Sequence, residues 1–180
     1  MTDDNLIEKR ISSEKKFSGK IIDLSVDSVL LPDGKKAERE YVSHRGGASV
    51  LAIDNEQNVY LVRQFRYPYG KILLEIPAGK LESGEDPAVA AARELEEETG
   101  FTGVITSYGS IYPTPGYTNE NLFIFLATNL KQTHRHPDED EFVDVVKMPL
   151  KSVLEKVLDN EIKDAKTCYA VLRYCYENGV

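Results

Sequence analysis

Residues Gly79 to Phe101 read GKLESGEDPAVAAARELEEETGF, a turn-rich loop followed by a segment with unusually many carboxylates. Signals that start and stop a helix frame this segment. Asp86 is a favourable N-cap residue, Pro87 suits a first helical turn, and Gly100 suits the left-handed residue after a last turn. The pattern therefore predicts a short helix between Asp86 and Gly100.

Three glutamates of this helix share one face. Residues of an α-helix advance by about 100° each, so Glu94, Glu97 and Glu98 fall in one wedge while Glu96 points the other way. Small and apolar side chains flank this acidic wedge and predict the strip that packs against a sheet: Ala88, Ala91, Ala92 and Leu95. We therefore expect the acidic wedge, Glu94, Glu97 and Glu98, at the edge of a core.

The acidic wedge is costly for a helix by itself. Like charges at these spacings destabilise a helix by roughly a few tenths of a kcal/mol per pair. A hard cation such as Mg²⁺ would reverse this effect, because it prefers carboxylate oxygens and often shares them with substrate phosphates. Arg93, four residues before Glu97, can also hold that carboxylate in place. From the helix alone, a solvated acidic face remains the alternative interpretation.

The whole chain is acidic, and this narrows its partners. Its 180 residues are enough for one domain with a substantial core. The net charge is −8, and residues 82–98 contain seven acidic residues against one arginine. This balance disfavours a nucleic-acid partner and suits metal ions that bridge to an anionic substrate.

The sequence also predicts a location. No apolar run approaches the length of a membrane span and the first residues carry no apolar signal region, so we expect no membrane partner. Cys168 and Cys175 lie seven residues apart on a predicted helix, about 10 Å by helical rise, which is too far for a disulfide. Free thiols suit a reducing compartment, and a cytoplasmic location is expected.

Residues 1–45 are expected to form a small N-terminal β subdomain. Residues 17–31 alternate in the manner of a strand, and residues 36–44 return as a second strand after the turn at 32–35. Residues 6–16 are polar and predicted to be weakly helical at best. Because such a hairpin is marginally stable alone, it must pack on the rest of the chain or on a second copy.

Residues 46–180 are expected to form the main domain. The predicted elements are strands at 48–53, 59–65, 73–76, 104–112, 122–127 and 142–148, and helices at 151–159 and 164–177. Arg63 on the second of these strands and Arg66 just after it are candidates for binding phosphate oxygens, and an ordinary cationic strand edge is the alternative. Two polar loops complete the set, the proline-containing loop 113–120 and the acidic run 138–141.

Gly79, Glu85 and the run Arg93–Phe101 resemble the Nudix box at every defining position. Over nearly its whole length the chain is similar to the ADP-ribose pyrophosphatase subfamily of Nudix hydrolases. Outside the box, the resemblance is carried by Arg39-Glu40, Gln64-Phe65-Arg66, Pro115 at 14 residues past Phe101, the acidic loop and the segment 161–165. Nucleotide-sugar hydrolases share parts of this layout.

The resemblance implies a fold and an assembly. The expected fold is of the α+β class, a Nudix α/β/α sandwich with a mixed sheet and an N-terminal antiparallel β-hairpin subdomain. That subdomain would serve dimerisation and substrate contact, in a homodimer with exchanged N-terminal strands.

The resemblance also implies roles for individual residues. The cofactor would be Mg²⁺, with Mn²⁺ as a substitute, held by the carbonyl of Ala78 and by Glu94, Glu97, Glu98 and Glu141. Glu139 would be the general base, with Glu141 as the alternative, and Glu97 and Arg93 complete the catalytic set. Arg66 would grip the diphosphate and Arg39 and Glu40 would reach the adenine. Further substrate contacts are expected from Gly79, Pro115 and Glu120.

The implied reaction is hydrolysis of a small-molecule nucleoside diphosphate, ADP-ribose, to AMP and ribose 5-phosphate. One alternative is a Nudix pyrophosphatase for another nucleoside diphosphate derivative, such as a sugar nucleotide of the GDP-mannose kind. The other is a non-catalytic Nudix-fold binding module, which predicts a damaged box. The intact Glu94, Glu97 and Glu98 speak against the binding module.

Overall fold

The computed structural model describes residues 3–136 and 142–180 and divides the chain into two compact units. The N-terminal unit contains Met1–Gly46 together with the loop Thr114–Glu120. The C-terminal unit contains Gly47–Pro113 and Asn121–Val180. A loop that is distant in sequence is therefore grouped with the N-terminal strands.

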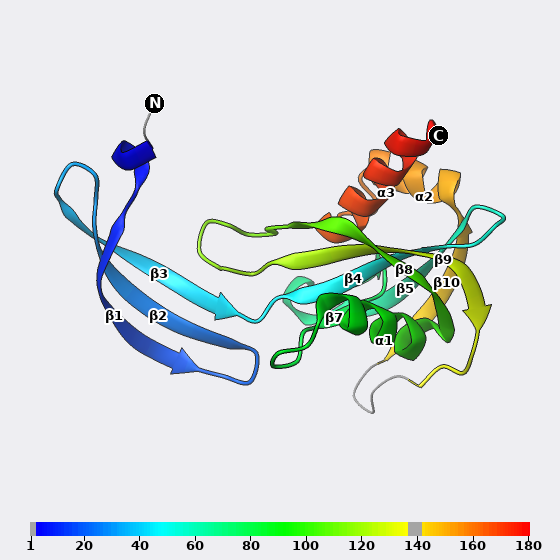
Figure 1. The fold of residues 1–180 in the computed structure, drawn as a ribbon, viewed down its shortest axis with the longest axis horizontal. Helices are drawn as coiled ribbons and strands as arrows, with labels where there is room; N and C mark the ends of the chain where they lie inside the picture. The colour runs from blue at the N-terminus through cyan, green and yellow to red at the C-terminus, as the bar shows by residue number, and fades with distance from the viewer. Residues whose placement is uncertain (1–2, 137–141) are drawn as a thin grey trace. The chain divides into compact units, whose positions relative to one another are not determined.

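The N-terminal unit is built on an antiparallel sheet with strand order β1-β2-β3 (Figure 1). Its elements are the 3₁₀ helix η1 (Asp3–Leu6), β1 (Lys9–Ser18), β2 (Ile22–Leu30) and β3 (Lys36–His44). The expected hairpin is present as β2 and β3. In its turn Gly34 adopts a φ of 84°, and the Lys35 N–H donates to Asp33 Oδ1 at 3.0 Å.

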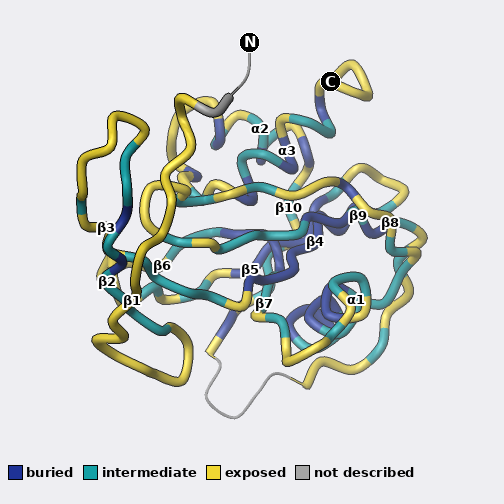
Figure 2. Tube along the Cα trace, turned by 60° about the vertical axis from the view of Figure 1, so that its left-hand side comes forward, coloured by how far each residue is buried: buried dark blue, intermediate teal, exposed yellow. Residues whose placement is uncertain are grey.

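The strand β1 corrects the prediction of a weakly helical segment at residues 6–16. Every residue of β1 is exposed, and the strand is exposed along its length in Figure 2. A strand without a buried face has no apolar alternation, so its pairing with β2 leaves no periodic signal in the sequence. The N-terminal subdomain is consequently a three-stranded sheet rather than a hairpin.

The loop Thr114–Glu120 pairs with β3. The Val42 N–H donates to the Tyr117 carbonyl at 2.8 Å, and the Asn119 N–H donates to the Val42 carbonyl at 3.3 Å. The side chain of Asn119 also accepts from the His44 N–H at 2.8 Å. These bonds anchor the proline-containing loop to the N-terminal unit.

The C-terminal unit is built on a mixed sheet with strand order β10-β5-β4-β9-β8, in which β6 pairs with β5 and β7 pairs with β4. Only β4 and β9 run parallel among the described strand pairs. The strands are β4 (Gly47–Ile53), β5 (Asn58–Arg66), β6 (Lys71–Glu75), β7 (Ala78–Lys80), β8 (Phe101–Ile111), β9 (Leu122–Gln132) and β10 (Val143–Pro149). The helices are η2 (Tyr67–Tyr69), α1 (Pro87–Thr99), α2 (Leu150–Leu158) and α3 (Ala165–Asn178).

Helices cover both faces of this sheet (Figure 1). On one face Leu95 of α1 shares a core with Val50 of β4. On the other face Val153 of α2 and Val171 of α3 share a core with Leu51. Because neighbouring side chains of a strand point to opposite faces, consecutive residues of β4 enter opposite cores. The expected α/β/α sandwich with a mixed sheet is confirmed.

The predicted strands and helices of the main domain are present, with shifted ends. The largest shift is in β9, which continues to Gln132, and β7 is a short strand that was expected to be loop. Cys168 and Cys175 are free thiols, as expected. Within the described residues, no helix combines the length and the apolar character needed to cross a membrane.

Candidate active site

The helix α1 begins and ends where its sequence signals predicted. Asp86 Oδ1 accepts from the Ala88 N–H at 2.8 Å and from the Val89 N–H at 3.3 Å, and Pro87 occupies the first turn. At the other end Gly100 has a φ of 72° and its N–H donates to the Glu96 carbonyl. These caps fix the ends of the helix, and its buried residues Ala90, Ala91 and Leu95 face the sheet.

The acidic wedge is largely buried. Glu94 and Glu98 are 6% and 1% exposed, and Glu97 is partly buried. The N–H of Ala78, at the start of β7, donates to Glu98 Oε2 at 3.0 Å. A solvated acidic face is therefore the wrong interpretation of this helix, because two of its three carboxylates are withdrawn from water.

Gly79 makes room for one of these carboxylates. A Cβ atom built on Gly79 would lie 1.8 Å from Glu94 Oε1 and 2.5 Å from Glu94 Oε2. The residue belongs to β7 and pairs with Ala48 of β4, so its backbone cannot retreat without breaking the sheet. Glycine is required here by the closeness of the carboxylate, not by a left-handed backbone.

Arg93 connects the acidic wedge to the loop before α1. Its Nη1 donates to Glu94 Oε1 at 2.8 Å and to Glu97 Oε2 at 2.9 Å, and its Nε donates to Glu85 Oε1 at 3.1 Å. The hydrogen bond with Glu85 raises the pKa of Arg93 and lowers the pKa of Glu85. The contact between Arg93 and Glu97 that the spacing predicted is present, and the contact with Glu94 is additional.

Arg66 lies at the end of β5 in a fork with Glu75, the last residue of β6. Its Nε donates to Glu75 Oε1 at 2.8 Å and its Nη2 donates to Glu75 Oε2 at 2.7 Å. Lys166 of α3 also donates to Glu75 Oε2. Burial raises the pKa of Glu75, but the hydrogen bonds and charges of Arg66 and Lys166 outweigh burial and hold this pKa at about 2.

Sequence reasoning missed Glu75 and Lys166. A charged residue inside the apolar segment Leu73–Ile76 is a signal of a buried ion pair, because an unpaired charge is too costly to bury. The partner could not have been identified in this way, since 91 residues separate Glu75 from Lys166.

The other predicted substrate-binding residues belong to the N-terminal unit. Arg39 binds Glu8 through Nε and Nη2, at 3.0 and 2.6 Å, and Glu40 is exposed on β3. Pro115 is exposed, and Glu120 Oε1 lies 3.6 Å from His44 Nδ1. Glu139 and Glu141, the predicted general bases, lie outside the described residues.

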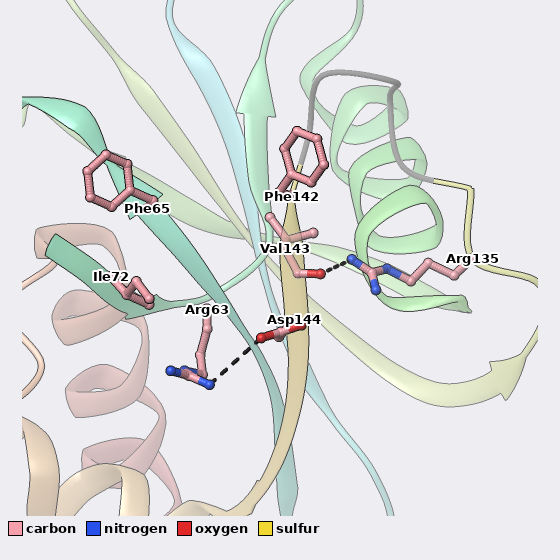
Figure 3. A pocket seen from close by; sticks show the side chains of 7 residues that line it. All are labelled: Arg63, Phe65, Ile72, Arg135, Phe142, Val143 and Asp144. Atoms are coloured by element: carbon pink, nitrogen blue, oxygen red, sulfur yellow. Dashed lines mark hydrogen bonds and ion pairs between the residues drawn. The ribbon is translucent and has the colours of Figure 1, made fainter. Parts of the chain in front are cut away.

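A shallow pocket of about 460 Å³ lies at the edge of the sheet formed by β5, β6 and β10 (Figure 3). Its lining combines aromatic, aliphatic and charged side chains: Arg63, Phe65, Ile72, Arg135, Phe142, Val143 and Asp144. Arg63 Nη1 lies 3.7 Å from Asp144 Oδ2, and Arg135 donates to the Val143 carbonyl. Arg63 and Arg66 are three positions apart on β5 and therefore point to opposite faces, and only Arg63 lines this pocket.

Comparison with known proteins identifies the family of this chain. Residues 43–170 match the family model described as the NUDIX domain. The chain belongs to the Nudix hydrolase family. Residues 8–42 match a second model, described as the nucleoside diphosphate sugar hydrolase N-terminal domain.

Several Nudix relatives are similar over most of the chain. An ADP-ribose pyrophosphatase of Bacillus subtilis is 47% identical over 93% of this chain and 92% of its own length. A methanol dehydrogenase activator of Bacillus methanolicus is 44% identical over 91% of this chain and 90% of its own. An ADP-ribose pyrophosphatase of Mycobacterium tuberculosis is 35% identical over 90% of this chain and 80% of its own.

Nudix hydrolases generally use a divalent metal ion, and the donor set of the acidic wedge fits such an ion. Carboxylate oxygens are the ligands that hard cations prefer, and Gly79 leaves the Glu94 carboxylate the space it occupies. Within residues 3–136 and 142–180, no three acidic, His or Cys side chains already form a metal cluster. Arg93 binds Glu94 and Glu97 in this arrangement.

Gly79→Ala is expected to weaken metal binding while the fold survives. The added methyl group meets the end of a flexible side chain, so the Glu94 carboxylate must move and the backbone need not. We expect Mn²⁺ affinity, measured by electron paramagnetic resonance, to fall about 10–100-fold, the range found when the support of a metal ligand is removed.

Val89→Ala is the matched control, because Val89 lies on the same helix and is 60% exposed. Equal Mn²⁺ affinity in Gly79→Ala and Val89→Ala would show that Gly79 does not make room for a metal ligand.

Proposed function

We propose that this protein hydrolyses the diphosphate bond of ADP-ribose, giving AMP and ribose 5-phosphate. The observation that carries the proposal is the seating of the acidic wedge, with Glu94 against Gly79 and Glu98 against the Ala78 N–H. Identity of 47% to an ADP-ribose pyrophosphatase over 93% of this chain supports the choice of substrate.

The proposed cofactor is Mg²⁺, with Mn²⁺ as a substitute. The proposed ligands are the carbonyl of Ala78 and the carboxylates of Glu94, Glu97, Glu98 and Glu141. When bound, such an ion neutralises diphosphate oxygens and lowers the pKa of the attacking water. Arg93 contributes by holding the carboxylates of Glu94 and Glu97 through one guanidinium nitrogen.

A carboxylate from the acidic run 138–141 is the proposed general base. Glu139 is assigned this role, with Glu141 as the alternative. A base within hydrogen-bond reach of the attacking water accelerates hydrolysis by about 10²–10⁴-fold. Arg66 is proposed to bind the diphosphate, since a guanidinium matches phosphate oxygens in geometry and charge. Gly79, Pro115 and Glu120 are proposed as further substrate contacts.

The N-terminal unit is proposed to contribute Arg39 and Glu40 to adenine recognition in a homodimer with exchanged N-terminal strands. Its strand β1 supports this assembly, because Ile11 and Phe17 are 49% and 55% exposed on a strand with no buried residue. The outer edge of an unpaired strand offers backbone N–H and C=O groups to a second copy, and two exposed apolar side chains could add contact area there. The net charge of −8 argues against a nucleic-acid partner. The free thiols support a cytoplasmic location.

A sugar nucleotide of the GDP-mannose kind is the second candidate substrate. It is favoured by the match of residues 8–42 to a nucleoside diphosphate sugar hydrolase N-terminal domain. A non-catalytic binding module is disfavoured, because the three carboxylates of the acidic wedge are intact and two of them are buried.

A substrate panel tests the choice between these functions. ADP-ribose, GDP-mannose, NADH and diadenosine polyphosphates are incubated with the protein and Mg²⁺, and products are separated by anion-exchange chromatography. We expect the highest kcat/KM with ADP-ribose and loss of turnover in EDTA. A preference for GDP-mannose would replace the first candidate by the second, and no hydrolysis of any compound would favour the binding module.

Glu98→Gln is expected to reduce turnover of ADP-ribose by ~10²-fold or more, because it removes a charged metal ligand. The fold should survive, since the amide can still accept from the Ala78 N–H, and circular dichroism checks this. Glu139→Gln should lose more turnover than Glu141→Gln if Glu139 is the base. Near-normal turnover in Glu98→Gln would remove this residue from the site.

Light scattering after size exclusion tests the assembly. We expect the unmodified protein to have the mass of a dimer and the double variant Ile11→Asp, Phe17→Asp to shift toward a monomer, because charges cannot be buried unpaired at an interface. Ser13→Asp on the same strand adds a charge without removing apolar surface and serves as the control. A monomeric unmodified protein would refute the exchanged dimer.

A further inference from the structure

Four charged residues form a buried ion cluster beside the acidic wedge. Glu75 is 1% exposed and Lys166 is 6% exposed, and they are joined by Asp164 and Arg66. The side chain of Arg66 is 36% exposed, so it connects the cluster to solvent. The buried ion cluster thus has two enclosed members at its centre and one arginine that a ligand can reach.

The fork between Glu75 and Arg66 determines which guanidinium N–H groups remain available. Glu75 uses the Nε and one Nη2 donor of Arg66, at 2.8 and 2.7 Å. The Nη1 atom of Arg66 makes no hydrogen bond with any residue that the structure describes. An arginine has five N–H donors in a rigid plane, so a carboxylate that holds one edge also orients the opposite edge. That opposite edge can bind a phosphate oxygen.

Lys166 balances the charge of the buried ion cluster. Two carboxylates, Glu75 and Asp164, face two cations, Arg66 and Lys166, and Lys166 Nζ lies 2.9 Å from Asp164 Oδ1. Without Lys166 the group would carry a net negative charge behind Arg66. A negative charge there would draw the guanidinium inward and repel an anionic substrate.

The buried ion cluster is also anchored to the chain that precedes the box. Thr167 Oγ1 accepts from the Ile76 N–H at 2.9 Å and donates to Asp164 Oδ2 at 2.5 Å. Ile76 lies two residues before Ala78, whose N–H binds Glu98. The pKa of Arg66 is raised first by Glu75 and also by the charge of Glu98, so the guanidinium is within electrostatic reach of the acidic wedge.

We propose that Lys166, acting through Glu75, is a positioning residue that orients Arg66 toward a phosphate oxygen of the substrate. The inference rests on the proposed function in one respect, that the substrate carries a diphosphate. It adds two residues, one of them from α3 far along the chain, to a site otherwise built from the box, the acidic loop and Arg66. Neither of them touches the substrate itself.

A merely structural role of Lys166 predicts different kinetics. Loss of packing would lower stability and the active fraction, which reduces kcat and leaves KM unchanged. Loss of orientation at Arg66 raises KM, because binding of the diphosphate weakens in the ground state. The two roles also differ in coupling, since a positioning effect disappears when Arg66 is already absent.

A double-mutant cycle tests the proposal. Lys166→Met and Glu75→Gln are each made in the unmodified protein and in the Arg66→Gln background, and KM and kcat are measured with ADP-ribose. Lys156→Met is the matched control, because Lys156 is a partly exposed lysine of α2 with an ion pair to Glu161 at 2.6 Å. Affinity for inorganic pyrophosphate in EDTA, measured by calorimetry, reads the same contact without hydrolysis.

We expect Lys166→Met and Glu75→Gln to raise KM and weaken pyrophosphate binding about tenfold, as for loss of one charge-assisted hydrogen bond. In the Arg66→Gln background, Lys166→Met and Glu75→Gln should each change KM and pyrophosphate affinity less than twofold. Lys156→Met should leave both quantities unchanged in the unmodified protein and in the Arg66→Gln background. Equal effects in both backgrounds, or unchanged values in Lys166→Met and Glu75→Gln, would overturn the proposal.

Failure of the proposed function has a different signature. An unmodified protein that does not hydrolyse ADP-ribose refutes that function, whereas the cycle in pyrophosphate affinity still decides the role of Lys166. If Lys166→Met does not fold, Lys166→Gln takes its place in the cycle, because it removes the charge and keeps a polar side chain beside Glu75 and Asp164.

Discussion

Burial of carboxylates at the junction of α1 and β7 is the constraint on which the C-terminal unit depends. Glu94 and Glu98 are withdrawn from water although each has a cost of desolvation. The cost is offset locally: the Ala78 N–H donates to Glu98, Arg93 donates to Glu94, and the absent side chain of Gly79 leaves space. This arrangement concentrates negative charge at a partly buried position, where a hard cation would be a favourable ligand for the carboxylates.

The surrounding contacts hold the carboxylates of the acidic wedge in fixed positions. The caps of α1 fix its ends, and Leu95 with the small residues Ala90 and Ala91 sets its rotation by packing against the sheet. Arg93 binds three carboxylates with one guanidinium, which suits its rigid fork better than a lysine. The positions of the carboxylates therefore follow from the packing of α1 against the sheet, and the ends of α1 follow from caps that can be recognised in the sequence.

A second group of buried charges lies beside the first, and the two differ in balance. The acidic wedge carries excess negative charge, whereas the buried ion cluster of Glu75, Asp164, Arg66 and Lys166 is neutral. A diphosphate with its cation needs both kinds of surface, carboxylates for the metal ion and an oriented guanidinium for the phosphate oxygens. The short segment between β6 and β7 connects them, because the Ile76 N–H donates to Thr167 Oγ1 two residues before Ala78.

The sequence by itself determined the elements whose causes are local. The ends of α1 follow from Asp86, Pro87 and Gly100, and the acidic wedge follows from helical spacing, as does the contact of Arg93 with Glu97. Tertiary structure alone decided what depends on partners distant in sequence. The strand β1 exists through pairing with β2, Gly79 is constrained by Glu94, and Glu75 meets Lys166 across 91 residues. Periodicity reports a residue's own environment, whereas these contacts depend on how separate elements come together in space.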